Sequence, residues 1–424
     1  MKMRNYLICV PILMASSAFG QLDFERAPIN YSDSTPTDRV AQFAERLKDG
    51  RASLTWTNDH GYLQSLLKEL NVPVSSQTLV FSKTSLQVSR ISPRKPRAVY
   101  FNDDIYVGWV QRGDLIEISA SDPALGGTFY TLPQQPNSAV RIKRETSRCL
   151  QCHGSTHTRR IPGHMVRSVY SDEWGQPVFR LGTHLNNHTT PYQNRFGGWY
   201  VTGTHGKQRH MANVFLEDPD TSEQLDRDAG ANVTDLSTIF DTDPYLSRHS
   251  DIVALMVLQH QAHMHNILTA ANHSGRLTAR DAVIMNRALD RDETYQSEST
   301  VRRYESAAEK VVKGLLFVDE PQLIAPVVGT SSFTTEFAQR GPFDRVDRTL
   351  RTFNLQTRLF EYPCSFLIYS DAFQQLPTGV YVRVEQLLKN VLTGKNDSEE
   401  YAHLSPDVRS AIHSILSDTT KLKL

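Results

Sequence analysis

The spacing of apolar residues changes period about halfway along the chain. Between residues 78 and 132, apolar and polar residues alternate in short runs that are separated by polar residues, glycine or proline, and this pattern predicts antiparallel strands. The turn residues Asn102-Asp103-Asp104 predict a hairpin between two of these runs. A further hairpin is expected over residues 165–182, with its turn at Asp172 to Gly175. Short helices are expected before the strands, at 37–49 and 62–70.

From about Ser250 the apolar residues recur with helical spacing. Ser250 is the expected N-cap of a helix that runs to residue 272, and Thr278 the expected N-cap of a separate helix that follows it. Further helices are expected at 299–316, at 379–393 with Gly394 closing it, and after Ser405-Pro406-Asp407.

These patterns predict an α+β protein in which a β-rich N-terminal region precedes a mainly α-helical C-terminal region. We expect a β-rich domain at residues 21–216 and a helical domain at 250–424 that packs on or near it. The intervening stretch, 217–249, is acidic, polar and weakly periodic, which is typical of a linker.

The first twenty residues resemble a secretory signal. Lys2 and Arg4 precede an apolar run over residues 6–14, and Ala18-Phe19-Gly20 provides a small-residue cleavage site. Residues 1–20 are therefore predicted to be removed, which places the mature protein in the periplasm or otherwise outside the cytoplasm. After cleavage no apolar stretch is long enough to span a membrane.

Composition excludes one class of partner. The chain has 46 lysine and arginine residues against 46 aspartate and glutamate residues, so it lacks the basic excess that nucleic-acid binding requires. Three of its four cysteines lie after the predicted cleavage point, at 149, 152 and 364, too few for a disulfide framework. We expect Cys364, which precedes an apolar run, to be a buried and inert thiol.

The pentapeptide Cys149-Leu150-Gln151-Cys152-His153 carries the most specific chemistry in the sequence. In a CxxCH motif two thiols add to the vinyl groups of haem, and the adjacent histidine becomes the proximal ligand of the iron. A structural zinc site would need further ligands at short spacing, and there is no second CxxC. A redox dithiol needs no histidine after the second cysteine. These two alternatives stay open but are less favoured.

In this motif the chain resembles monohaem c-type cytochromes. The resemblance covers five residues, and it implies one covalent haem c, with Cys149 and Cys152 as the thioether anchors and His153 as the proximal ligand. Arg159 and Arg160, just beyond the motif, could pair with the haem propionates or could form a solvated basic turn.

The sequence offers several candidates for the sixth iron ligand. Met165 follows the motif at a loop length that could pass around the haem, although a buried methionine at a strand start explains it as well. His205 lies in a glycine-rich loop, where functional residues concentrate. His260 lies on the apolar face of the helix that begins near Ser250, and such a face could contact haem.

Two functions follow from this sequence. The first is an exported c-type cytochrome that acts in electron transfer with a redox partner protein. The second is a haem c enzyme, or a gas or redox sensor, with an open distal pocket. The sequence leaves open whether the protein is an enzyme and identifies no catalytic residue.

Overall fold

A seven-stranded antiparallel sheet occupies the first half of the chain. The computed structural model describes residues 22–136, 140–217 and 225–424, so the predicted signal segment lies outside the described residues. The strand order is β6-β5-β4-β3-β2-β1-β9. The strands are β1 (Thr78–Val80), β2 (Arg97–Phe101), β3 (Ile105–Trp109), β4 (Leu115–Asp122), β5 (Gly126–Pro133), β6 (Lys143–Arg144) and β9 (Trp199–Tyr200).

The two faces of this sheet are covered by different parts of the chain. Strand β4 alternates between buried and partly exposed positions, and its buried Ile116 and Ile118 pack with helices α1 (Arg39–Lys48) and α2 (Leu63–Glu69). On the opposite face, Phe101 and Tyr106 pack with the long helix α4 (Ile252–Ala288). The sheet is therefore an inner layer with helices on both sides.

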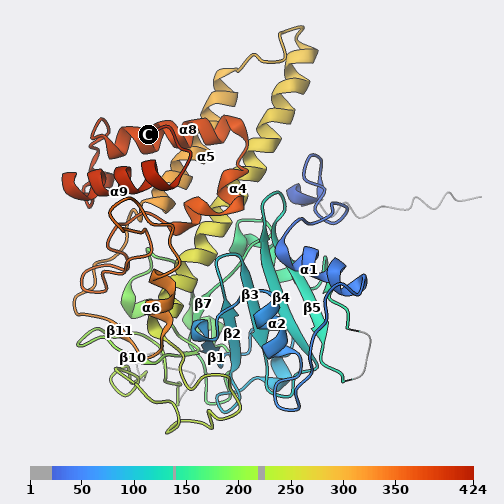
Figure 1. The fold of residues 1–424 in the computed structure, drawn as a ribbon, viewed down its shortest axis with the longest axis vertical. Helices are drawn as coiled ribbons and strands as arrows, with labels where there is room; N and C mark the ends of the chain where they lie inside the picture. The colour runs from blue at the N-terminus through green and yellow to red at the C-terminus, as the bar shows by residue number, and fades with distance from the viewer. Residues whose placement is uncertain (1–21, 137–139, 218–224) are drawn as a thin grey trace, which may run out of the picture.

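Two small two-stranded sheets and six further α-helices complete the strands and α-helices of the described residues. Strand β7 pairs with β8, and β10 with β11. In Figure 1 the helices of the second half lie beside the sheet, and the α4–α5 hairpin extends beyond both. The remaining bounds are β7 (Arg167–Val169), β8 (Thr183–Leu185), β10 (Gly203–Thr204), β11 (Val328–Gly329), α3 (Leu150–His153), α5 (Glu298–Leu315), α6 (Phe333–Ala338), α7 (Asp371–Gln374), α8 (Thr378–Leu392) and α9 (Pro406–Thr419).

The α+β class predicted from the sequence is confirmed, with strands mainly in the first half and helices mainly in the second. The expected turn at Asn102-Asp103-Asp104 joins β2 to β3, and Ser405 caps α9 by accepting a hydrogen bond from the amide of Val408. The turn expected between Asp172 and Gly175 is also present, because the amide of Gly175 donates to the carbonyl of Asp172.

The predicted division of α4 is wrong. One helix of 37 residues runs through Gly275 and Thr278, and the Thr278 hydroxyl donates to the Ser274 carbonyl instead of capping a new helix. The N-cap is Asp251, one residue after the expected Ser250, and its carboxylate accepts hydrogen bonds from the amides of Val253 and Ala254. The Ser250 hydroxyl donates instead to the carbonyl of Tyr200 in β9.

The segment predicted as a linker packs against the sheet. Residues 218–224 lie outside the described residues, and residues 225–249 contain no helix or strand. Even so, Leu236, Phe240 and Tyr245 are buried in the core that covers one face of the sheet, and the ring of Phe240 stacks on that of Tyr200. Residues 225–249 therefore form an irregular layer that covers one face of the sheet.

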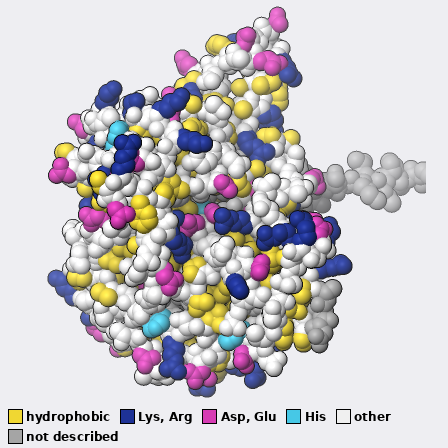
Figure 2. Space-filling view, in the orientation of Figure 1, with side chains coloured by type: hydrophobic (Ala, Val, Ile, Leu, Met, Phe, Trp, Pro, Cys, Tyr) yellow, Lys and Arg dark blue, Asp and Glu magenta, His cyan; other side chains and the backbone are white. Residues whose placement is uncertain are grey.

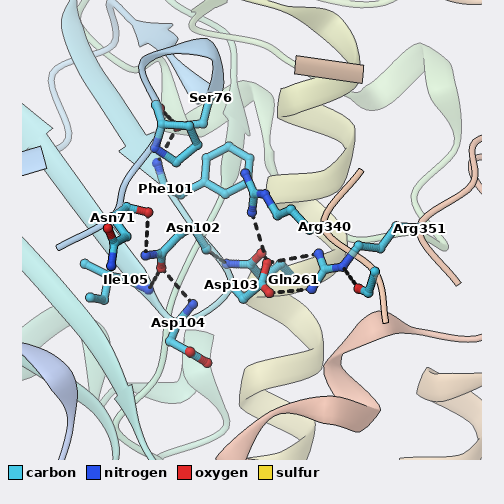
Figure 3. A network of polar contacts seen from close by, with 12 residues as sticks. Asn71, Ser76, Phe101, Asn102, Asp103, Asp104, Ile105, Gln261, Arg340 and Arg351 are labelled. Carbon is cyan, nitrogen blue, oxygen red and sulfur yellow. Dashed lines mark hydrogen bonds and ion pairs between the residues drawn. The ribbon is translucent and has the colours of Figure 1, made fainter. Parts of the chain in front are cut away.

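An ion-pair network joins the sheet to the second half of the chain. Figure 3 shows Asp103, in the β2–β3 turn, facing Arg340 and Arg351 from the C-terminal half. Beside it, the Gln261 side chain of α4 donates to the carbonyl of Asn102 at 2.7 Å. Over the face seen in Figure 2, lysine and arginine side chains are interspersed with aspartate and glutamate, as the equal numbers of the two kinds predict.

Candidate functional site

The CxxCH motif forms the single helical turn α3. Cys149 is its N-cap residue, and Cys152 and His153 follow three and four positions later, so all three side chains share one side of the turn. Leu150 is buried with Phe24, Ile29 and other apolar residues and anchors the turn to the protein. Cys152 is exposed and Cys149 is partly buried, and neither forms a disulfide.

The imidazole of His153 has a defined tautomer. Its Nδ1 atom lies 2.8 Å from the carbonyl oxygen of Gly163, and because a carbonyl can only accept, Nδ1 carries the hydrogen and Nε2 has the free lone pair. Burial lowers the pKa of His153, against the opposing effect of the Gly163 carbonyl, so the ring is neutral at pH 7. Among the described residues no hydrogen bond to Nε2 is found. The ring packs against Phe129 of β5, with 4.7 Å between the ring centroids.

This hydrogen bond also fixes which way the ring faces. Nδ1 points toward Gly163, and therefore Nε2 points away from the segment that contains Gly163 and His164. His164 itself is buried over β4, with its two ring nitrogens 3.4 Å from the hydroxyls of Ser119 and Ser121. Gly163 and His164 are not among the site residues predicted from the sequence, although the alternation of β4 shows that this face of the sheet is polar.

Charged groups of the sheet lie near the motif. Arg97 of β2 and Glu117 of β4 form an ion pair of 2.7 Å over Gly108, and both charges influence the pKa of His153. Burial raises the pKa of the Cys149 thiol to about 11, and the carboxylates of Glu117 and Glu145 add to the rise.

The raised pKa of Cys149 bears on the two alternatives to haem. A redox dithiol needs a thiol whose pKa is lowered, so the surroundings of Cys149 oppose that chemistry. A zinc site needs several converging ligands, and the described part of the chain has no group of three histidine, cysteine, aspartate or glutamate residues that could hold a metal ion. Cys364 is fully buried away from solvent, and burial raises its pKa to about 12.

Met165 lies on a small cavity. It is partly buried and lines a space of about 110 Å³ with residues such as His157, Asn186 and His263. None of Cys149, Cys152 and His153 lines this space. Met165 therefore does not share this cavity with the three residues of the motif.

His205 uses both of its ring nitrogens within its own loop. Nδ1 donates to the carbonyl of Gln208 at 3.0 Å, and Nε2 accepts from the amide of Asn232 at 3.0 Å. Ring contacts to Tyr192 and His210 enclose it further. His205 thus stabilises a glycine-rich loop and is not free to bind iron.

His260 is likewise engaged within the core. Its Nε2 lies 2.7 Å from the hydroxyl of Ser365 and its Nδ1 lies 3.3 Å from Nδ1 of His188, while the ring stacks on Phe317 at 4.1 Å. Burial, with the neighbouring histidines, lowers the pKa of His260 well below its ordinary value. These contacts give no support to His205 or His260 as the distal iron ligand, a role for which the sequence made them candidates.

Comparisons with known protein families, with curated proteins and with solved structures find no match to this chain. Within the described residues, no helix is both long enough and apolar enough to cross a membrane.

Proposed function

We propose that this chain is an exported c-type cytochrome that holds one covalent haem c through Cys149 and Cys152, with His153 as the proximal ligand, and that it acts in electron transfer. The observation that carries the proposal is the hydrogen bond from His153 Nδ1 to the Gly163 carbonyl. A histidine that binds a metal through one ring nitrogen characteristically donates from the other to a carbonyl or carboxylate, which fixes the ring and raises its basicity.

The residues of the motif fit a covalently held haem. Both thiols are free, they lie on the same side of one helical turn as the imidazole, and the imidazole is neutral as a metal ligand must be. Bound haem would supply a one-electron iron couple. The protein's part is to hold His153 in one tautomer and to anchor α3 through Leu150.

Exposed positions beside the motif support electron transfer to a partner protein. Cys152 is exposed, so this attachment point lies at the surface. Near Cys152, the ring of Phe179 lies beneath the guanidinium of Arg167 and is 53% exposed. Leu86, whose amide donates a hydrogen bond to Glu117, is 40% exposed. These exposed apolar side chains would be available to contact a redox partner docked at this surface.

A haem c enzyme, or a gas or redox sensor, is the second candidate, and one observation favours it. Met165, His205 and His260 all have other surroundings or other partners, so none of them takes the sixth position in this arrangement. An iron with an open sixth position binds exogenous ligands.

The test is to express the full precursor in a host with an active cytochrome c maturation system. We expect the secreted chain to lack residues 1–20, to carry the mass of one haem and to keep its colour after acid–acetone extraction. Cys149→Ala and Cys152→Ala should each lose one thioether bond, whereas Cys364→Ala should retain full attachment. A mature chain at its bare polypeptide mass would refute the proposal.

The spectrum of the same protein separates the two candidates. Low-spin iron that does not bind carbon monoxide indicates a carrier with an internal sixth ligand. High-spin iron that binds carbon monoxide rapidly indicates the enzyme or sensor.

A further inference from the structure

Two adjoining cavities lie between helices α4 and α5 and the segment that follows the CxxCH motif. The outer cavity, of about 320 Å³, is lined mainly by α4 and α5. The inner cavity, of about 110 Å³, lies between α4 and residues 157–166 and 185–187. Arg159 and Ile267 line both, so the two spaces are neighbours that share these side chains. Because Cys149, Cys152 and His153 line neither cavity, this place is distinct from the motif.

The outer cavity is strongly cationic. Arg159, Arg302, Arg303 and Lys310 line it together with the hydroxyl-bearing Ser274, Ser299 and Ser306, and no carboxylate is among the lining residues. Arg303 is neutralised by Asp281 at 3.0 Å. For the other three cations no ion pair is found in the described part of the chain. Cations that converge on a concave surface without counter-charges favour an anionic ligand.

The inner cavity contains a buried amide without a protein partner. Asn186 is 4% exposed, and neither its Oδ1 nor its Nδ2 atom is hydrogen-bonded within the described residues. Leaving both ends of a buried amide unpaired is costly, and such groups in native proteins call for an explanation. A ligand that offers both a donor and an acceptor would satisfy Asn186.

The surroundings of Asn186 suit an uncharged polar group. His263 also lines the inner cavity, and burial, assisted by the charge of Arg159, lowers its pKa to about 4, so the ring is neutral at pH 7. The remaining lining includes the apolar Val166, Ala262 and Ile267, and no carboxylate. Among the residues that line the inner cavity, Arg159 therefore carries the positive charge, and it also lines the outer cavity.

The loop that carries Arg159 is held in place from both sides. The Thr158 hydroxyl lies 3.0 Å from the carbonyl of His153 and 2.7 Å from that of Ile161. Arg159 itself has a left-handed backbone, with φ of 59°. The guanidinium is thus presented from a fixed turn, which lowers the entropy cost of binding.

We propose that these cavities form a binding site for a small organic anion, with its oxyanion group at Arg159, Arg302 and Lys310 and a hydroxyl-bearing part at Asn186. The shared chemistry is a carboxylate or phosphate with hydroxyl groups attached. Guanidinium groups bind both oxyanions through charge-assisted hydrogen bonds. The site does not depend on haem attachment, so the proposal stands or fails separately from the proposed function.

The test is isothermal titration calorimetry on the full mature chain at constant ionic strength. Two matched pairs of probes are used, acetate with glycerate and inorganic phosphate with glycerol 3-phosphate. We expect the hydroxyl-bearing member of one pair to bind with a Kd of about 1 mM or tighter, and more tightly than its bare partner. The pair that shows this difference identifies the oxyanion as carboxylate or phosphate.

Three variants locate the binding. Arg159→Ala should weaken binding about tenfold or more, whereas the adjacent and exposed Arg160→Ala, which lines neither cavity, should change it less than about twofold. Asn186→Leu should abolish the advantage of the hydroxyl-bearing probe, and it should not lower the melting temperature because no protein hydrogen bond is lost. Equal effects of the two arginine variants, or no saturable binding by any probe, would overturn the proposal.

Discussion

Replacing Asp103 with asparagine should destabilise the contact between the sheet and the C-terminal half of the chain. The Asp103 carboxylate accepts hydrogen bonds from Arg351 at 3.1 and 2.5 Å and pairs with Arg340 at 3.3 Å (Figure 3). The side chain of Arg351 is only 5% exposed, and its guanidinium packs on the rings of Phe337 and Phe366. Without the carboxylate, Arg351 would keep the Gly341 carbonyl and the two aromatic rings as partners but would lose its negatively charged one.

The expected loss is about 3 kcal/mol of unfolding free energy. Removing one partner of a buried ion pair costs about 3–5 kcal/mol, because the remaining charge stays buried. We expect the lower end of this range because the Asp103 side chain is 32% exposed, so water can partly take the place of its carboxylate beside Arg351. Burial alone would raise the pKa of Asp103, but Arg351 and Arg340 outweigh burial and lower it. The stabilisation by the pair is therefore present above the ordinary pKa of about 4 and is lost as the pH falls below it.

The assay is guanidinium unfolding of the wild type, Asp103→Asn, Arg351→Met and the double variant at pH 7 and pH 3. The double-mutant cycle should give a coupling energy of about 2 kcal/mol or more at pH 7, and much less at pH 3. The control is Asp114→Asn, which removes an exposed pair with Arg90 and should cost less than about 1 kcal/mol. If Asp103→Asn costs no more than the control, the reasoning is refuted.

Three further predictions concern other buried groups. Burial raises the pKa of Glu320 to about 7, against the opposing effect of the Leu359 amide. The free energy of unfolding should therefore fall by about 3 kcal/mol as the pH rises from about 4.5 to 7. In unfolding curves measured at pH 4 and pH 8, Glu320→Gln should abolish this fall. Gly275→Ala would place a Cβ 2.9 Å from side-chain atoms of Pro377 and Val380. Although alanine has the better helix propensity, the melting temperature should fall by a few degrees. An increase would contradict the close packing of α4 on α8. His260→Ala, made in the haem-loaded protein, should leave the spin state of the iron unchanged, because both ring nitrogens already have partners; a change of spin state would restore His260 as a ligand.

Several regular elements of the first half could be predicted because they depend on a local pattern, whereas the short strands β9 and β10 could not. Alternation in β4 and the turn at Asn102-Asp103-Asp104 depend on neighbouring residues, so the sequence contains the needed information. The continuity of α4 could not be predicted in this way. Thr278 is an ordinary N-cap by local criteria, and it stays inside the helix because α4 packs along α5 and, around Gly275, against the start of α8.

The same distinction separates the two sides of the proposed iron site. The proximal side is local, since one helical turn places Cys149, Cys152 and His153 together whatever the rest of the chain does. A distal ligand depends instead on tertiary contacts, and a buried neutral histidine is most often present because its nitrogens hydrogen-bond with other parts of the protein. His205 and His260 are of this kind, and their loop and helix positions gave no sign of it. A histidine is therefore a better ligand candidate when one nitrogen is fixed by a carbonyl and the other is free, as in His153, than when it merely lies on an apolar face.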